Sequence, residues 1–138
     1  MPDSVNFHFL HEHDPVFLPL AAAAERAFAS DPNTTLIKLR QLGEALAQDL
    51  AARSGIAFDE TTTQADLLWK LHREIHLDPT IREIFHTLRI EGNRAAHQFS
   101  TQHKEAMAGL KMARALAVWY HQSFGRQGTT FKPGPFTP

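Results

Sequence analysis

The chain has 138 residues, with 14 lysines and arginines, 15 acidic residues, nine histidines and no cysteine. A chain of this length fits one domain that needs neither a disulfide nor a structural metal. The absence of cysteine excludes disulfides, thiol catalysis and cysteine-ligated zinc. The formal net charge of −1 excludes a protein that is basic throughout, but it is compatible with a local basic patch.

The apolar runs and the first residues carry no targeting or membrane signal. The longest apolar run, residues 17–24, is interrupted by Pro19 and is shorter than the roughly 20 residues that span a bilayer. The first residues, 1–4, are acidic and lack the charged and apolar regions of a secretory signal. We therefore expect a soluble cytoplasmic protein without a membrane partner.

Hydrophobic patterning divides the chain into three parts and predicts an all-α fold. Residues 1–14 form a polar, histidine-rich lead-in, and residues 15–124 have the helical periodicity of a bundle of four to five helices. Residues 125–138 contain three glycines and three prolines. This tail should be extended and poorly ordered unless it docks, and we interpret it as a linker toward downstream domains.

Local start signals place the first two helices. The first is expected over residues 15–30. Asp31 followed by Pro32 is typical of an N-cap and a first helical position, so the second helix should run to about residue 54, with Gly55 as its C-cap. Its predicted buried stripe recurs at three- or four-residue steps and comprises Leu36, Leu39, Gly43, Leu46 and Leu50.

Three further helices follow. Thr62 or Thr63 should cap the third, which extends through Ile75. Asp78 and Pro79 repeat the cap-then-proline signal and start the fourth, which we expect to reach Phe99. Ser100 or Thr101 restarts a fifth helix that ends near Phe124. Two tryptophans, at positions 69 and 119, occupy apolar helical positions and are expected in the core.

The segment 88–97 contains the most unusual polar pattern. Arg89, Asn93 and His97 lie at i, i+4 and i+8, so a helix would align them in one row. Gly92 costs about 1 kcal/mol relative to Ala within a helix but allows close approach of a backbone or a ligand. In one interpretation His97 is an acid/base and Arg89 or Arg94 holds a phosphate. In the other, Asn93 and His97 bond to a neighbouring helix and fix its register.

Arg40 and Glu44 on the second helix form a related candidate. Gly43 faces the packing stripe, so Glu44 beside it is placed to reach Arg89, Asn93 or His97 across the bundle. The alternative is an ordinary solvated i, i+4 ion pair between Arg40 and Glu44.

The histidines do not predict a metal site. His72 and His76 are four residues apart, but the residues between them do not give the His-Glu-x-x-His order of metalloproteases, and a helix C-terminus itself favours histidine. The three histidines of the lead-in, His8, His11 and His13, lie in a segment expected to be mobile. Six basic residues cluster near the fourth and fifth predicted helices: Arg94, His97, His103, Lys104, Lys111 and Arg114. They form either a weak patch facing nucleic acid or an ordinary solvated face.

Several segments together resemble the N-terminal region of the R (restriction, motor) subunit of type I restriction–modification enzymes. They are residues 6–10, 31–40, 43–44, 85–89, 92–93, 96–97, 116–120 and 131–136. The resemblance implies a non-catalytic accessory domain without a cofactor of its own. It implies that the parent enzyme uses ATP and Mg²⁺, assembles with modification and specificity subunits, and cleaves DNA.

The chain is also similar to the HEPN helical superfamily, many members of which are metal-independent ribonucleases that form dimers. Asn93 and His97 match the polar residue and the histidine of its motif, but Gly92 occupies the arginine position. Arg89 is three positions too early and Arg94 two too late. This departure favours a binding or assembly role. The alternatives are a divergent ribonuclease, acting as a homodimer, and a nucleotide- or nucleic-acid-binding module.

Overall fold

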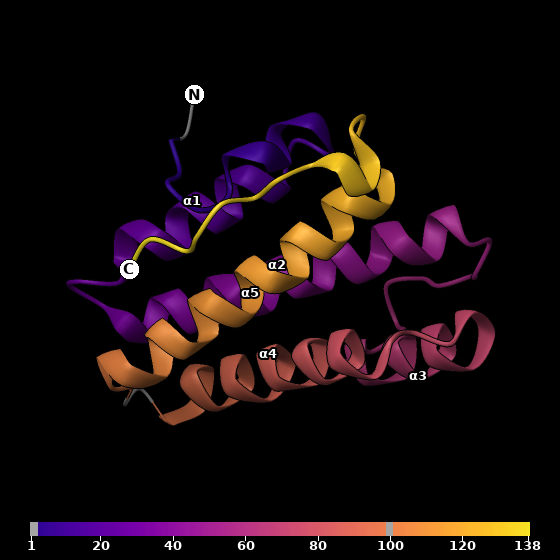
Figure 1. Ribbon diagram of the computed structural model, residues 1–138. Helices are drawn as coiled ribbons and strands as arrows, with labels where there is room; N and C mark the ends of the chain where they lie inside the picture. Colours follow the sequence, from indigo (N-terminus) through magenta and orange to yellow (C-terminus); the bar gives the residue numbers. More distant parts are fainter. Residues whose placement is uncertain (1–2, 99–100) are drawn as a thin grey trace.

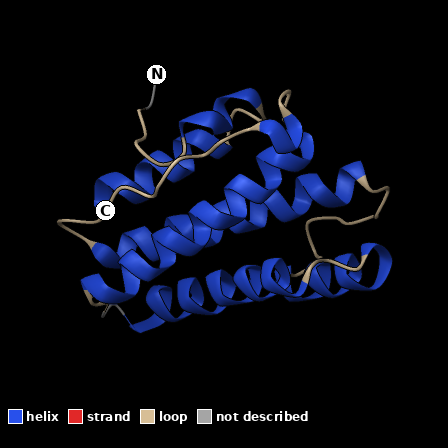
Figure 2. Ribbon diagram, viewed as in Figure 1, coloured by secondary structure: helices blue, strands red, loops and turns tan. Residues whose placement is uncertain are grey.

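The computed structural model describes residues 3–98 and 101–138. Within them the chain forms five α-helices and two short 3₁₀ turns, and the described residues contain no strand (Figure 2). The elements in chain order are η1 (His8–Glu12), α1 (Phe17–Ala27), α2 (Pro32–Arg53), α3 (Gln64–Ile75), α4 (Pro79–Gln98), α5 (His103–Phe124) and η2 (Gly128–Thr130). The prediction of an all-α bundle is confirmed.

Short polar side chains set the helix starts, as the sequence predicts. The Asp31 carboxylate accepts a hydrogen bond from the Thr34 amide at 3.3 Å, and the Thr63 hydroxyl accepts one from the Asp66 amide at 3.1 Å. Asp78 accepts from the Thr80 amide at 2.9 Å. Each bond satisfies a donor that the first turn of a helix leaves free.

The connection between α4 and α5 differs from the prediction in one respect. Gln102, rather than Ser100 or Thr101, is the N-cap of α5, and it forms a reciprocal capping box with Glu105. The predicted end of α4 at Phe99 and the alternative cap Ser100 lie outside the described residues.

Helix α2 is the centre of the bundle. It packs against α1, α3, α4 and α5, and α5 crosses it in Figure 1. The predicted stripe of α2 is buried, and α4 adds the buried side chains of Ile81, Ile84, Phe85 and Leu88. No helix in the described part of the chain is both long and apolar enough to cross a membrane.

Both terminal segments pack on this bundle. Phe7 and Leu10 are fully buried, so the polar lead-in contributes two anchors to the core. The tail is extended and docked, and it runs back along the bundle from the end of α5 (Figure 1). The Asn6 side chain donates to the Thr137 carbonyl at 2.9 Å and accepts from the Thr137 amide at 2.8 Å. The two ends of the chain are therefore hydrogen-bonded to each other.

The tryptophan prediction is wrong for one position and right in part for the other. Leu67, Leu68 and Leu71 occupy the buried face of α3, so Trp69 points away from it and is 56% exposed. The Arg73 guanidinium lies 4.5 Å from the centre of the Trp69 ring. Trp119 on α5 is half-buried and packs against the core.

Candidate functional site

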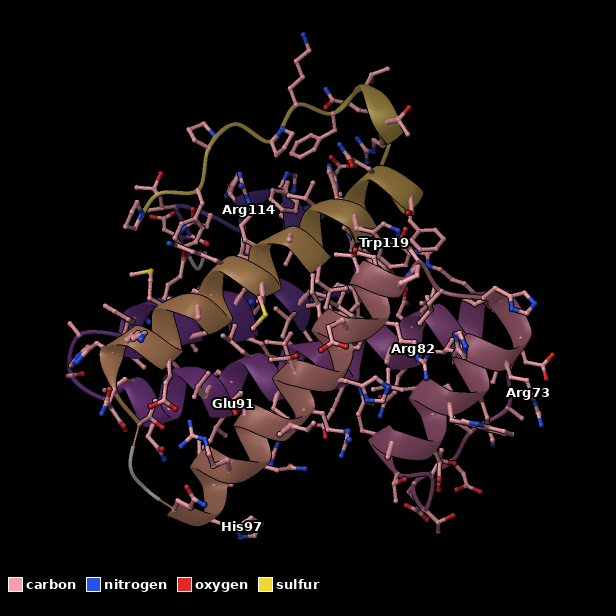
Figure 3. All side chains as sticks on the ribbon, turned by 60° about the horizontal axis from the view of Figure 1, so that its bottom comes forward. Arg73, Arg82, Glu91, His97, Arg114 and Trp119 are labelled. Carbon is pink, nitrogen blue, oxygen red and sulfur yellow. The ribbon has the colours of Figure 1, made fainter. Side chains whose placement is uncertain are left out.

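The predicted polar row forms on one helix. Arg89, Asn93 and His97 all lie on α4, with Arg89 half-buried and the other two side chains exposed. His97 is in the last turn and projects from the C-terminal end of α4 (Figure 3). We call these three residues the α4 row.

Gly92 of α4 packs closely against Arg40 of α2. A Cβ placed on Gly92 would lie 2.3 Å from Cβ of Arg40 and 2.9 Å from its Cγ, closer than real Cβ contacts. The Arg40 side chain therefore runs across Gly92, and its Nη1 donates a hydrogen bond to Oδ1 of Asn93 at 3.2 Å. The close approach predicted for Gly92 is thus made by a side chain of the neighbouring helix.

Glu44 does not make the predicted contact. It is half-buried on α2, but among the described residues it forms no hydrogen bond or ion pair with Arg89, Asn93 or His97. Arg40, one turn earlier, makes the link across the bundle instead. It does so because Gly92 leaves room for its long side chain.

Two residues that the sequence analysis did not single out extend the row toward the start of α4. Arg82 and His86 precede Arg89 by seven and three positions, and Figure 3 shows Arg82 between α4 and α3. Burial lowers the pKa of His86, and the positive charges of Arg89 and Arg82 lower it further. The same i+3 and i+4 spacing that defines the α4 row would have revealed both residues.

Arg40, Arg82 and Arg89 have no carboxylate oxygen within 4 Å in the described ranges 3–98 and 101–138. In contrast, Arg94 lies 2.7 Å from Glu105 and 3.3 Å from Glu91. Within those ranges the charges of the three arginines are therefore not compensated by a direct ion pair. We call Arg40, Arg82, His86 and Arg89 the cationic face.

Three residues of the other basic patch predicted from the sequence make contacts within the fold. Arg94 is ion-paired, and Arg114 on α5 donates to the Asn6 carbonyl at 3.2 Å and the Pro133 carbonyl at 2.6 Å. Nε2 of His103 lies 3.2 Å from the Ala29 carbonyl. These three cations therefore make contacts within the fold, whereas His97, Lys104 and Lys111 of the same patch are exposed.

Asn33, another residue missed by the sequence analysis, fixes the end of α4. Its Nδ2 donates to the carbonyl of Ala95 at 2.7 Å, and its Oδ1 accepts from the Thr101 hydroxyl at 2.6 Å. One side chain from the start of α2 thus satisfies a terminal carbonyl of α4 and holds the segment that follows. This bond positions the last turn, which carries His97.

His72 and His76 do not lie on the same helix. Helix α3 ends at Ile75, and His76 has a φ of 50°, in the left-handed region. His72 and His76 are therefore not two ligands on one helical face. Among the described residues no group of three or more metal-binding side chains comes together.

The chain belongs to the family described as Domain of unknown function (DUF4145), whose model matches residues 22–121. The matched range includes α2, α3, α4 and the α4 row. Over 122 residues the chain is 38% identical to the type I restriction enzyme EcoKI endonuclease subunit of Escherichia coli (strain K12), which confirms the resemblance to such a subunit. The match covers 88% of this chain and 10% of that relative, so the chain spans about a tenth of its length. No solved structure matches significantly.

Proposed function

We propose that this chain is a non-catalytic accessory domain of a type I restriction endonuclease subunit and that its cationic face engages DNA. The observation that carries the proposal is the 38% identity to such a subunit across 88% of the chain. The relative's length leaves room for other domains, to which we assign cleavage and the use of ATP and Mg²⁺. Modification and specificity subunits are the proposed protein partners, in the cytoplasm.

The geometry of the α4 row supports a non-catalytic role. Asn93 accepts a hydrogen bond from Arg40, and Gly92 accommodates the stem of the same side chain. These contacts pack α2 against α4, so the α4 row has a structural role at this interface. Position 92 lacks the arginine that the HEPN motif places there, so we assign no catalytic step to His97.

The cationic face supports DNA engagement. Arg82 and Arg89 are seven residues apart on α4, which corresponds to about 10 Å along the helix axis. Neither has an acidic partner among the described residues; Arg82 is exposed and Arg89 is half-buried, and we propose that both contact phosphate oxygens. Contacts of this kind position a protein on DNA without reading its sequence, which fits a domain that leaves target choice to a specificity subunit.

Binding of a fluorescent DNA duplex tests this surface. Replacing Arg82 and Arg89 together by Gln should weaken binding and reduce the slope of log K against log salt by about 2. A matched control replaces Arg26 and Lys111, exposed cations on α1 and α5, by Gln. Equal losses in the two double variants would mean that net charge, and not this face, determines binding.

Co-purification tests the alternative role in assembly. The long subunit in which we place this domain should still join modification and specificity subunits after residues 1–138 are deleted, if the domain serves DNA engagement. Loss of that assembly would show that the domain docks onto the other subunits and would contradict a role in DNA contact alone.

A divergent HEPN-type ribonuclease is a second candidate, and one observation favours it. The guanidinium of Arg40 lies at Asn93, beside the position where the motif's own arginine is missing, so α2 supplies an arginine from another helix. In this case His97 would be the acid/base, and a homodimer would complete the site. RNA cleavage that His97→Ala and Arg40→Gln both abolish would support it, and cleavage that neither changes would refute it.

A further inference from the structure

A pair of imidazoles, one buried and one half-buried, lies away from the cationic face, near the end of α5. Nε2 of His13 and Nδ1 of His121 are 2.8 Å apart, and His121 is 1% exposed. Two imidazoles share such a bond only while one facing nitrogen carries a hydrogen and the other does not. The contact therefore cannot persist when both rings are doubly protonated.

Glu12, the residue before His13, contacts both His121 and the segment that follows α5. Its Oε2 lies 3.7 Å from Nε2 of His121, and its Oε1 accepts a hydrogen bond from the Arg126 amide at 3.2 Å. That amide bond lowers the pKa of Glu12. Glu12 and His13 together thus connect the end of η1 to α5 and to the segment that follows it.

The His121 ring is enclosed by both terminal segments. The ring centres of Phe9 and Phe131 lie 5.0 Å and 4.4 Å from it. A Cβ on Gly125 would lie 2.7 Å from its Nδ1, so the chain leaving α5 passes directly over the ring. Displacement of His13 or His121 therefore affects where residues 125–131 can lie.

The charged groups around the pair allow one of the two rings to become an imidazolium and oppose protonation of the other ring. Burial is the main cause that lowers the pKa of both His13 and His121, and Glu12 opposes this effect on each. Arg53 disfavours a charge on His13 and Asp49 favours one, whereas His11 disfavours a charge on His121. One imidazolium next to Glu12 keeps the hydrogen bond, while a second would place two N–H groups face to face.

We propose that Glu12 and His13 form a proton-operated clasp that ties residues 125–131 to the end of α5 at neutral pH and opens on acidification. Opening separates the His13 and His121 rings and frees the Arg126 amide from Glu12. The rest of the fold is held independently, because Phe7 and Leu10 are buried and Asn6 holds Thr137 through two hydrogen bonds.

Nuclear magnetic resonance of the complete chain between pH 8 and 5 tests the clasp. The amide signals of Arg126, Gly128 and Phe131 should shift together with the ring titration of His13 and His121. The Thr137 amide should stay in place across that range. Absence of a shift in residues 125–131 while both rings titrate would overturn the proposal, as would loss of all helical signals in the same step.

Two variants separate the clasp from a general effect of histidine protonation. His13→Gln provides an amide that bonds to His121 without titrating, so the transition at residues 125–131 should disappear or move to lower pH. His8→Gln removes an exposed histidine of the same 3₁₀ turn and should keep the parent profile. An unchanged transition in His13→Gln would show that His13 is not the group that opens the segment.

Discussion

Polar residues have different roles in two regions of the molecule. One is the interface between α2 and α4, and the other is the part of the bundle that the first and last segments of the chain cover, which we call the terminal end. At the α2–α4 interface, hydrogen bonds run from Arg40 to Asn93 and from Asn33 to the Ala95 carbonyl, beside a tightly packed apolar contact. At the terminal end, Asn6 and Arg114 bond to the last segment of the chain, and His121 bonds separately to His13 of the first segment. The α4 row follows from a regular spacing in the sequence, whereas the contacts of Asn6, Arg114 and His121 involve segments without such a spacing. A buried polar group needs a partner wherever the fold places it.

The largest expected effect tests whether the lead-in belongs to the core. Leu10→Ala removes a fully buried side chain and should lower the free energy of unfolding by about 2–5 kcal/mol, measured by urea denaturation. Val5→Ala, at a position 74% exposed, should change it by no more than about 0.5 kcal/mol. Equal effects would mean that residues 3–14 are not part of the cooperative unit.

The next effect tests the close approach of α2 and α4. Gly92→Ala places a methyl group 2.3 Å from Cβ of Arg40, so the helices must separate, at a cost of about 1–3 kcal/mol in unfolding free energy. Gly43→Ala is the matched control on α2, because its Cβ would lie 3.8 Å from Leu88 in ordinary contact. That change should stabilise by up to about 1 kcal/mol through helix propensity. The same loss in both variants would refute a special packing role for Gly92.

Acidification should weaken the terminal end first. The pKa values of His13 and His121 are lowered in the fold, mainly by burial, so below the ordinary value of 6.5 the unfolded chain binds more protons than the folded one. The contribution of these two histidines to the free energy of unfolding is complete above pH 6.5, and it is lost as the pH falls through their pKa values in the folded chain. Thermal unfolding at pH 7.5 and 5.5 should show a smaller drop in Tm for His13→Gln than for the parent chain. A drop of the same size would contradict the assignment.

The smallest effect concerns the hydrogen bond of the α4 row. Asn93→Ala removes an exposed acceptor of Arg40 and should cost less than about 1 kcal/mol in unfolding free energy. Asn93→Asp keeps the acceptor and adds a charge opposite the guanidinium, so it should be neutral or slightly stabilising. A cost of several kcal/mol for Asn93→Ala would give this bond a larger structural role than its exposure indicates.

Local signals in the sequence determined the helices and their starts. The residues that start α2, α3 and α4 act within a single helical turn; they are Asp31 with Pro32, then Thr63, then Asp78 with Pro79. The apolar spacing on α2 and α4 identifies the buried faces of these two helices. These features depend on residues close together in the chain, so they follow from composition and spacing. The row on α4 was predicted for the same reason.

Only the tertiary structure decided which polar groups meet. Arg40 and Asn93 are 53 residues apart, and His13 and His121 are 108 apart, so nothing in their local sequence identifies the partner. Exposure of Trp69 likewise depends on which face of α3 the bundle covers. Long-range partners are set by how helices pack, because a side chain bonds to whatever the neighbouring helix presents, and here Gly92 made room for Arg40 where Glu44 had been expected.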